Sequence, residues 1–527
     1  MAEESVKPLV QQTANDGSVV ATTRLTPVED KVRGSMVVPP TTVVPVIFVP
    51  GIMGSNLRDK KTKESVWNVN STVSILLQWV FRSAKTRQSK LRADDAEVDP
   101  SGKWYGKSAT VPDKSTGHQR GQGSTSKASY GDFVCWLDDK LSGLTGGIAQ
   151  GASSPWSEMV DQGIGQWSPE RTPQALTQSN ADFAWDNFYC PVHVVGYNWL
   201  QSNGESGKYL AEKITEIIAE WNGKGSAGGP AFRCEQVILI SHSMGGLVTR
   251  AAVHSAFGSA ADKVLGIVHG EQPANGAAAA YHHCRSGYGG ISGWVLGRNA
   301  AQVTAVFANS PGAMELLPNH QYPTGWLKAR VGSDSAAVFE LPVSDPYDDI
   351  YLEKERWWRL IDEQLIDPSK KIENPWHNFY INVITVTGFH YTLGTTYHPR
   401  TYVHYGADEK AYPAYGDLIW YSAAASNPNP TALLAATPID GSDPVTVRVG
   451  QKMAFSIAGP KGLGYPQPGD GTVPACSGEA PHIQGGGNIK QSFRLSGFEH
   501  QGSYNNDAVR QTTFYSICML LQEAKVL

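Results

Sequence analysis

The sequence predicts an α/β fold in which a mostly parallel sheet carries helices on both faces. Two observations carry this prediction. Short apolar runs rich in β-branched residues alternate with segments of helical hydrophobic spacing, and the run at 237–240 consists of four consecutive apolar residues. The chain has 527 residues, of which 41% are hydrophobic and 18% charged, enough for a large core with sizeable insertions. A formal charge of −5 without a basic run argues against nucleic-acid binding.

The core elements follow in chain order. We expect the first strand at 43–50, and a second at 192–197 is followed by a helix that begins near Ser202 or Asn203. One face of this helix carries Leu210, Ile214, Ile217, Ile218 and Trp221. Further strands are predicted at 237–240, 264–269, 379–387 and 492–495, and a last helix at 507–522.

The segments between these elements indicate insertions in one domain. Residues 1–44, rich in Thr, Val, Ser and Gln, predict an extended N-terminal arm, and residues 45–527 predict the α/β domain. Insertions are expected at 58–180, 277–375 and 388–465, the second of them placed as a lid or cap would be. We see no Sec-type signal peptide and no apolar run long enough to span a membrane. The six cysteines are scattered, which favours neither zinc nor a dense disulfide framework.

Ser243 lies between the predicted strand 237–240 and a helical pattern that starts at Leu247. The intervening SHSMG approximates G-x-S-x-G, with Ser241 in place of the first glycine. A strand, a tight turn with serine and a helix form a nucleophile elbow, which exposes the serine hydroxyl above the sheet edge. The alternative interpretation is a buried turn with a capping serine.

A serine nucleophile needs a histidine base and an orienting carboxylate, here expected in the chain order Ser, acid, His. Asp470 lies between two glycines, and His500 follows the last predicted strand. We therefore predict Ser243 as nucleophile, His500 as base and then acid, and Asp470 as the orienting carboxylate. An ordinary Asp-Gly turn and a loop histidine are the alternatives for the last two. Weaker candidates are Asp345, Asp348, Asp349, Glu499, His390 and His398.

An oxyanion hole needs two backbone donors. One is expected from Met244, the residue after the nucleophile. The other is expected from the glycine-containing loop 50–54, at Ile52 or, as the alternate, at Met53.

The segments VPVIFVPGIMGSNL, VILISHSMGGLVTR, PGDGTVP and FEHQGSY together resemble α/β-hydrolase lipases of the lecithin:cholesterol acyltransferase-like and GPI inositol-deacylase-like branch. The resemblance covers about half of the chain and does not extend to 58–180 or 388–465. It implies hydrolysis of acyl esters through an acyl-enzyme, without a redox cofactor or catalytic metal. A structural calcium ion near the acid and histidine loops stays open.

The chain is also similar to bacterial phospholipases delivered by the type VI secretion system. That resemblance implies an antibacterial toxin without a Sec signal, delivered into the periplasm of target cells and acting on membrane phospholipids. It further implies an immunity protein and a secretion-system spike or adaptor as partners. The alternatives are a carboxylesterase or neutral-lipid lipase exported by another route, an acyltransferase, and a catalytically inactive hydrolase fold that serves in binding.

Overall fold

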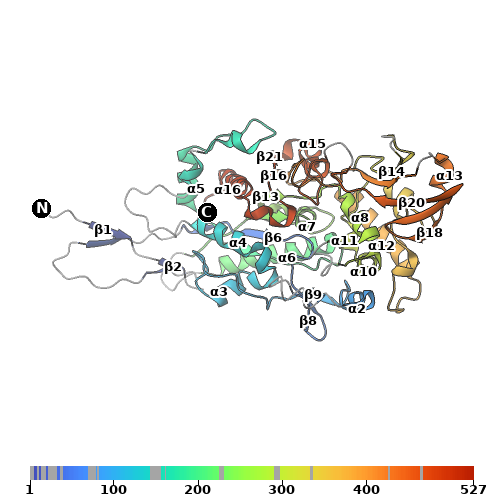
Figure 1. The fold of residues 1–527 in the computed structure, drawn as a ribbon. Coiled ribbons are helices and arrows are strands. Elements are labelled where there is room, and N and C mark those ends of the chain that lie inside the picture. Colours follow the sequence, from blue (N-terminus) through green and yellow to red (C-terminus); the bar gives the residue numbers. More distant parts are fainter. Residues whose placement is uncertain are drawn as a thin grey trace.

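The computed structural model describes residues 40–68, 79, 82–142, 156–160, 162–224, 231–289, 297–332, 336–424, 428–462 and 467–527. It also assigns four short strands further towards the N-terminus: β1 (Ser5–Pro8), β2 (Gln11–Thr13), β3 (Val19–Ala21) and β4 (Val32–Ser35). The prediction of an extended arm at 1–44 therefore falls mostly outside the described residues. Figure 1 shows the order of the elements along the chain.

The central sheet has six strands in the spatial order β11-β6-β12-β13-β16-β21, and every neighbouring pair is parallel. In register, Leu239 of β12 lies between Ile47 of β6 and Ile267 of β13. The strands are β6 (Val46–Val49), β11 (Val192–Val194), β12 (Val237–His242), β13 (Val264–Gly270), β16 (Thr401–Gly406) and β21 (Ile489–Leu495). The mixed α/β class and the parallel sheet are as predicted.

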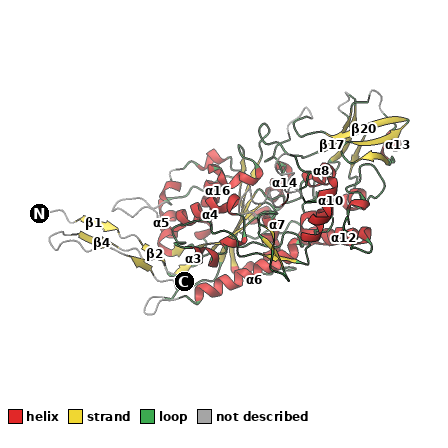
Figure 2. Cartoon of the chain, turned by 60° about the horizontal axis from the view of Figure 1, so that its bottom comes forward, coloured by secondary structure: helices red, strands yellow, loops and turns green. Residues whose placement is uncertain are grey.

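Helices cover both faces of this sheet, which explains why β6 and the first four residues of β12 are continuous apolar runs. Ile238 and Ile240 of β12 pack in one core cluster with residues of α4 (Lys127–Ser142) and α16 (Asp507–Leu521). Val237 and Leu239, which point to the other face, pack with α6 (Asn203–Asn222) and α7 (Gly245–Val253). Figure 2 shows these helices around the central strands.

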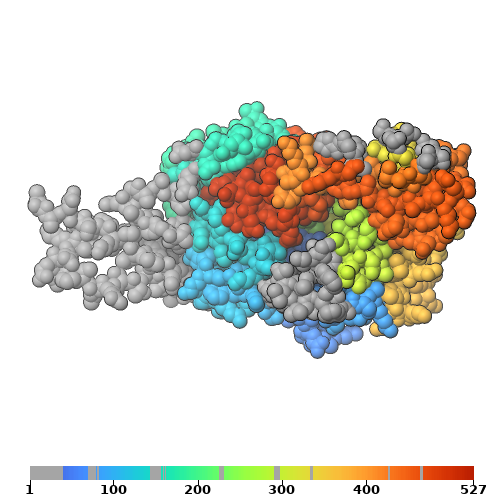
Figure 3. All heavy atoms as spheres, in the orientation of Figure 1, coloured from blue at the N-terminus to red at the C-terminus, as the bar shows by residue number. Residues whose placement is uncertain are grey.

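A second sheet lies at the end of the molecule away from both termini (Figures 1 and 2). Its order is β15-β14-β17-β20-β19-β18. Its strands are β14 (Leu327–Val331), β15 (Phe339–Leu341), β17 (Leu418–Ser422), β18 (Pro438–Gly441), β19 (Val445–Val449) and β20 (Gln451–Ile457). All of these strands except β18 share a third core cluster with α8 (Ala278–Ser286), α10 (Ala300–Phe307), α11 (Pro311–Met314) and α12 (Pro375–Leu393). The space-filling view shows this part packed directly against the central-sheet part (Figure 3).

Shorter elements connect these layers. Three strands, β7 (Leu57–Asp59), β8 (Ser65–Trp67) and β9 (Ala96–Val98), form a small sheet next to α2 (Ala84–Lys90). The strands β5 (Thr42–Val43) and β10 (Phe188–Tyr189) pair in parallel, and the remaining longer helices are α3 (Lys114–Gln119) and α5 (Gln178–Asn187). The short helix α13 (Pro430–Leu434) packs with the second sheet, whereas α14 (Ala475–Gly478), α15 (Ala480–Gln484) and the 3₁₀ turn η8 (His500–Asn505) belong to the central-sheet part. No helix among the described residues has both the length and the apolar composition to cross a bilayer.

The strand predicted at 379–387 is wrong, because this segment lies inside helix α12. The sheet position expected for it belongs to β16 (Thr401–Gly406), so the predicted insertion 388–465 contains a strand of the central sheet. The helix was missed because Ile381 and Ile384 are exposed on its outer side, so its pattern is apolar all round and shows no helical period. Segment 58–180 was interpreted as lacking a periodic core, but it contributes α4 to the sheet core, where Tyr130, Phe133, Val134, Leu137 and Leu141 are buried at helical spacing.

Candidate active site

Ser243 lies in the turn between β12 and α7, as the elbow predicts. Its φ of 53° is in the left-handed region, which is uncommon for a residue with a side chain, and its N–H donates to Gly270 O at 2.9 Å. The neighbouring chains leave no room for side chains. A Cβ on Gly245 would lie 2.5 Å from Pro50 O, and a Cβ on Gly51 would lie 2.9 Å from Ser243 Cβ. Glycine at these positions is therefore a steric requirement of the elbow.

The structure brings Ser243, His500 and Asp470 together. His500 Nε2 lies 2.8 Å from Ser243 Oγ, and His500 Nδ1 lies 2.7 Å from Asp470 Oδ2. Since the carboxylate accepts a hydrogen bond from Nδ1–H, Nδ1 carries the imidazole proton and Nε2 is the acceptor for the serine hydroxyl. The three side chains are at least 90% buried, although each comes from a different loop at the carboxyl end of the sheet.

Asp470 is held by its own loop. Its Oδ1 accepts hydrogen bonds from the backbone N–H groups of Thr472 (3.0 Å) and Val473 (2.7 Å). Its backbone carbonyl accepts the N–H of His500 at 2.8 Å, so acid and base are linked through main chain as well as side chain. This fixes which carboxylate oxygen faces the imidazole.

The pKa of His500 is raised above its usual value. Burial lowers the pKa, but the charge and hydrogen bond of Asp470 outweigh that effect, with smaller contributions from Glu271 and Glu499. A base with a raised pKa accepts the proton of the serine hydroxyl more readily, which suits general-base catalysis near neutral pH.

A buried relay connects the loop 50–54 with the histidine loop. The carbonyl of His500 accepts from His242 Nε2 (2.9 Å), so His242 Nδ1 accepts from the Tyr130 hydroxyl (2.9 Å). The Tyr130 oxygen in turn accepts the N–H of Gly51 at 3.1 Å. Burial and the proximity of His500 lower the pKa of His242 well below its usual value, so His242 serves as a neutral connector. Tyr130 was not predicted, because it lies on α4 within the segment interpreted as an insertion.

A second buried carboxylate also supports the histidine loop. Glu271, at the end of β13, accepts from Ser503 Oγ (2.8 Å) in η8 and lies 3.0 Å from His404 Nδ1. Glu271 and His404 are almost completely buried, and Glu271 has a φ of 49°. The sequence offered no signal for these contacts, since Glu271 is 232 residues from Ser503 and 133 residues from His404.

The predicted oxyanion donors border Ser243. Ile52 lies in the turn closed by the hydrogen bond from Gly54 N to Gly51 O (3.1 Å), and Met244 precedes the first residue of α7. Within the described residues, neither N–H has an acceptor in the chain. Met53, the alternate, has a φ of 62°, and its carbonyl accepts from Trp67 Nε1 at 2.8 Å.

The weaker candidates for the acid and the base have other contacts. His390 lies 2.7 Å from the Tyr347 hydroxyl and 2.9 Å from Glu315 O, and Glu499 accepts from Gln501 N at 3.2 Å. Asp345 and Asp349 accept from backbone N–H groups of the second-sheet part, and His398 Nδ1 accepts from Arg400 N.

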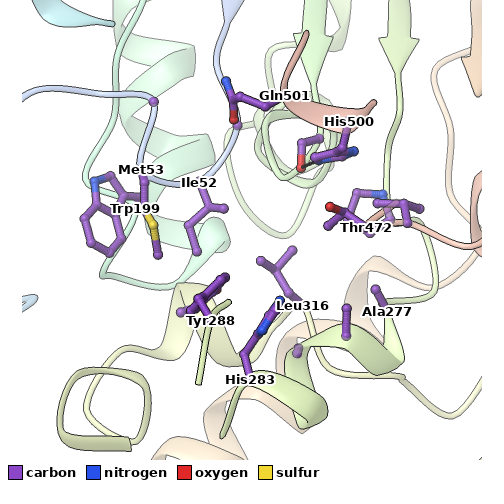
Figure 4. Close-up of a pocket in the computed structure, with 18 of the residues that line it drawn as sticks. Ile52, Met53, Trp199, Ala277, His283, Tyr288, Leu316, Thr472, His500 and Gln501 are labelled. Carbon is purple, nitrogen blue, oxygen red and sulfur yellow. Dashed lines mark hydrogen bonds between the residues drawn. The ribbon is translucent and has the colours of Figure 1, made fainter. Parts of the chain in front are cut away.

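Ser243 and His500 line a cavity of about 780 Å³ (Figure 4). One side of it is polar and includes Thr472, Glu499 and Gln501 of the acid and histidine loops. The opposite side is mostly apolar and comes from the segments 277–289 and 303–316. The apolar residues of these two segments are Ala277, Ala279, Ala280, Val303, Val306, Phe307, Ala313 and Leu316. Further apolar lining residues are Ile52, Met53, Trp67, Leu91 and Trp199.

Comparison with solved structures places the chain in a family. It is similar to Tle4 in the crystal structure of the Tle4-Tli4 complex, with a TM-score of 0.75 and 31% sequence identity. The match covers 92% of this chain and 99% of that chain. The protein therefore belongs to the family of Tle4, a type VI lipase effector.

Other comparisons add no family. No protein-family model and no curated protein matches the chain. The resemblance to the lecithin:cholesterol acyltransferase-like and GPI inositol-deacylase-like branch thus stays a prediction, whereas the resemblance to type VI lipase effectors is supported.

Proposed function

We propose that this protein is an α/β-hydrolase phospholipase with a Ser243–His500–Asp470 triad, and that it acts as an antibacterial type VI effector. The observation that carries the proposal is the continuous hydrogen-bond path from Ser243 Oγ through the imidazole to Asp470, at 2.8 and 2.7 Å. This is the arrangement that activates a serine for attack on an ester.

The reaction follows from these contacts. His500 Nε2 takes the hydroxyl proton of Ser243 while Oγ attacks the carbonyl carbon of an acyl ester. The N–H groups of Met244 and Ile52 stabilise the oxyanion that develops on the carbonyl oxygen. Collapse of the tetrahedral intermediate breaks the ester bond, and His500 returns the proton to the leaving lysophospholipid. Water then attacks the acyl-enzyme while His500 Nε2 takes its proton, and His500 returns that proton to Ser243 Oγ as the bond to the acyl group breaks and the fatty acid is released.

The cavity supports a lipid substrate. The part of its apolar side formed by Val303, Val306 and Phe307 suits an acyl chain, and its polar side holds the reacting groups. Membership of the Tle4 family supports lipase activity. No redox cofactor or catalytic metal enters the proposed chemistry, and a structural calcium ion stays open as a separate question.

The family also supports a biological setting. Tle4 was crystallised with Tli4, its immunity protein, so we propose that a cognate immunity protein binds this chain and blocks its activity. We further propose export by a type VI system, carried on a spike or adaptor protein, into the periplasm of target cells, where membrane phospholipids are the substrate.

Ser243→Ala tests the proposal. We expect loss of phospholipid hydrolysis by about 10³-fold or more, with the fold retained, because the change removes one oxygen at a turn. Mixed bacterial phospholipids are incubated with either form, and fatty acid and lysophospholipid are measured by mass spectrometry. Ser259→Ala is a matched control, since Ser259 also has a left-handed φ (53°) but lies outside the cavity.

Three other outcomes would contradict the proposal. Turnover of simple esters without phospholipid hydrolysis would favour a carboxylesterase. Acyl transfer to an alcohol in preference to water would indicate an acyltransferase. Equal hydrolysis by wild type and Ser243→Ala would exclude the triad itself.

A further inference from the structure

The cavity wall formed by α8 carries one polar side chain. Of the residues of segment 277–286 that line the cavity, three are alanines and the fourth is His283. Figure 4 shows His283 beside Tyr288 and Leu316, on the side of the cavity across from His500. A polar group in an apolar wall of a binding site commonly fixes the orientation and identity of the ligand.

The hydrogen bonds of His283 define what its free nitrogen can do. Its Nδ1 lies 3.3 Å from Gly287 O, and because a carbonyl only accepts, Nδ1 carries the proton. Nε2 is then an acceptor, and in the described part of the chain no donor reaches it. The ring stacks on Tyr288, with centroids 3.7 Å apart and planes inclined by 14°, so its orientation is fixed.

His283 is uncharged at physiological pH. Burial, together with the proximity of His282, lowers its pKa to about 3. A neutral imidazole neither attracts a phosphate as a cation would nor repels an ammonium group. Because His283 Nε2 is directed to the cavity without a donor from the described part of the chain, a substrate that brings a donor can form a hydrogen bond there and gains affinity.

We propose that His283 Nε2 forms a headgroup subsite that selects phospholipids with an N–H or O–H donor on the headgroup. This inference rests on the proposed phospholipase function. In a diacyl phospholipid the esters and the ionised phosphate only accept hydrogen bonds, so a donor for Nε2 comes from the headgroup. The ammonium of phosphatidylethanolamine and the hydroxyls of phosphatidylglycerol have this chemistry, whereas phosphatidylcholine lacks it.

A methylation series of one lipid tests the inference at constant charge. Phosphatidylethanolamine, its N-methyl and N,N-dimethyl forms and phosphatidylcholine, all with the same acyl chains, are hydrolysed in the same detergent micelles. We expect kcat/KM of the wild type to fall at least ten-fold along the series, with the largest step on loss of the last N–H. A second comparison measures kcat/KM for phosphatidylglycerol and for phosphatidylmethanol, which has no hydroxyl. It shows whether a headgroup hydroxyl, and not only an ammonium group, serves as the hydrogen-bond donor.

Variants of His283 assign the effect to the residue. His283→Phe keeps a ring to stack on Tyr288 but loses the acceptor, and we expect it to hydrolyse all four lipids of the series at similar rates. His283→Gln keeps an acceptor and is expected to retain part of the preference. His282→Phe is the matched control, because His282 is the adjacent residue of α8 but does not line the cavity, and the preference should persist.

The outcomes separate this inference from the function on which it rests. Equal rates for phosphatidylethanolamine and phosphatidylcholine in the wild type, or a uniform loss over the series in His283→Phe, would overturn the subsite alone. Absence of fatty acid from every phospholipid, with Ser243-dependent hydrolysis of p-nitrophenyl butyrate, would overturn the phospholipase proposal and the subsite with it. The ester assay and a melting curve report whether each variant folds. If His283→Phe does not fold, the rates of the wild type along the methylation series still test the subsite.

Discussion

Replacing Asp470 by asparagine tests the triad, because it changes which imidazole nitrogen of His500 carries the proton. Oδ1 of Asp470 accepts two backbone N–H groups, at 3.0 and 2.7 Å, and Oδ2 faces His500 Nδ1 at 2.7 Å. In Asp470→Asn the amide oxygen keeps the two backbone donors, because the opposite orientation would point NH₂ at two N–H groups. The amide NH₂ then faces Nδ1 and donates to it.

The expected magnitude follows from this orientation. With Nδ1 as acceptor, the imidazole proton moves to Nε2, which can no longer accept the proton of Ser243 Oγ. The opposite amide orientation loses two hydrogen bonds of about 1 kcal/mol each and leaves buried groups unsatisfied, so it does not rescue the correct tautomer. We expect kcat to fall by about 10³- to 10⁴-fold, as the wrong tautomer does in serine proteases, with little change in KM.

The assay is hydrolysis of p-nitrophenyl butyrate, with a melting curve to verify folding. Asp59→Asn is a matched control, since Asp59 Oδ1 also accepts two backbone N–H groups, from Lys61 and Thr62 at 2.8 Å each, but Asp59 does not line the cavity. This control should keep its activity within a few-fold of wild type.

A folded Asp470→Asn variant with more than a tenth of wild-type kcat would refute the reasoning. The orienting carboxylate would then have to be another residue. Glu499, next to the histidine in sequence, would be the first to replace, followed by the acidic residues of 345–349.

Two further predictions concern the supporting contacts. Tyr130→Phe leaves the N–H of Gly51 and Nδ1 of His242 without their partner, so we expect a loss of about 1–3 kcal/mol in unfolding free energy and a lower kcat, measured by urea unfolding and ester turnover; an unchanged kcat would separate the relay from catalysis. Burial raises the pKa of Glu315 to about 8, although the hydrogen bonds from Ser202 and Asn203 lower this pKa in part. The folded state therefore holds this proton more tightly than the unfolded state, and stability should fall as pH rises from about 4.5 to about 8, by at most about 1.4 kcal/mol per pH unit. Glu315→Gln should remove this pH dependence, so its unfolding free energy, measured with urea, should rise relative to that of the wild type between pH 5 and pH 8. A difference in unfolding free energy that stays constant over that range would contradict the prediction.

Local patterns predicted most of the central sheet. The runs that became β6, β12 and β13 are apolar on both faces because helices cover both, and that composition is visible without the structure. The elbow at Ser243 was also predictable, because a tight strand-to-helix turn requires small residues at fixed neighbouring positions. Asp470 and His500 followed from chain order and from the short loops that carry them.

Long-range contacts decided the rest. Tyr130 contacts Gly51, which is 79 residues away in the sequence, and Glu271 contacts Ser503, which is 232 residues away. No local sequence pattern indicates such partners. Helix α12 was mistaken for a strand because large apolar residues, among them Ile381 and Ile384, also lie on its exposed side. A helical hydrophobic period is visible only where the exposed side is polar.

Local patterns were therefore enough to predict the parallel sheet, the turn that carries Ser243 and the segments that carry Asp470 and His500. The tertiary structure decided how these groups are oriented, through hydrogen bonds at 2.7–3.1 Å from residues distant in sequence. It also decided which wall of the cavity faces Ser243 and that His283 is the polar side chain of α8 within it. The physical reason is that an element forms from its own periodicity, whereas a site forms where several elements meet.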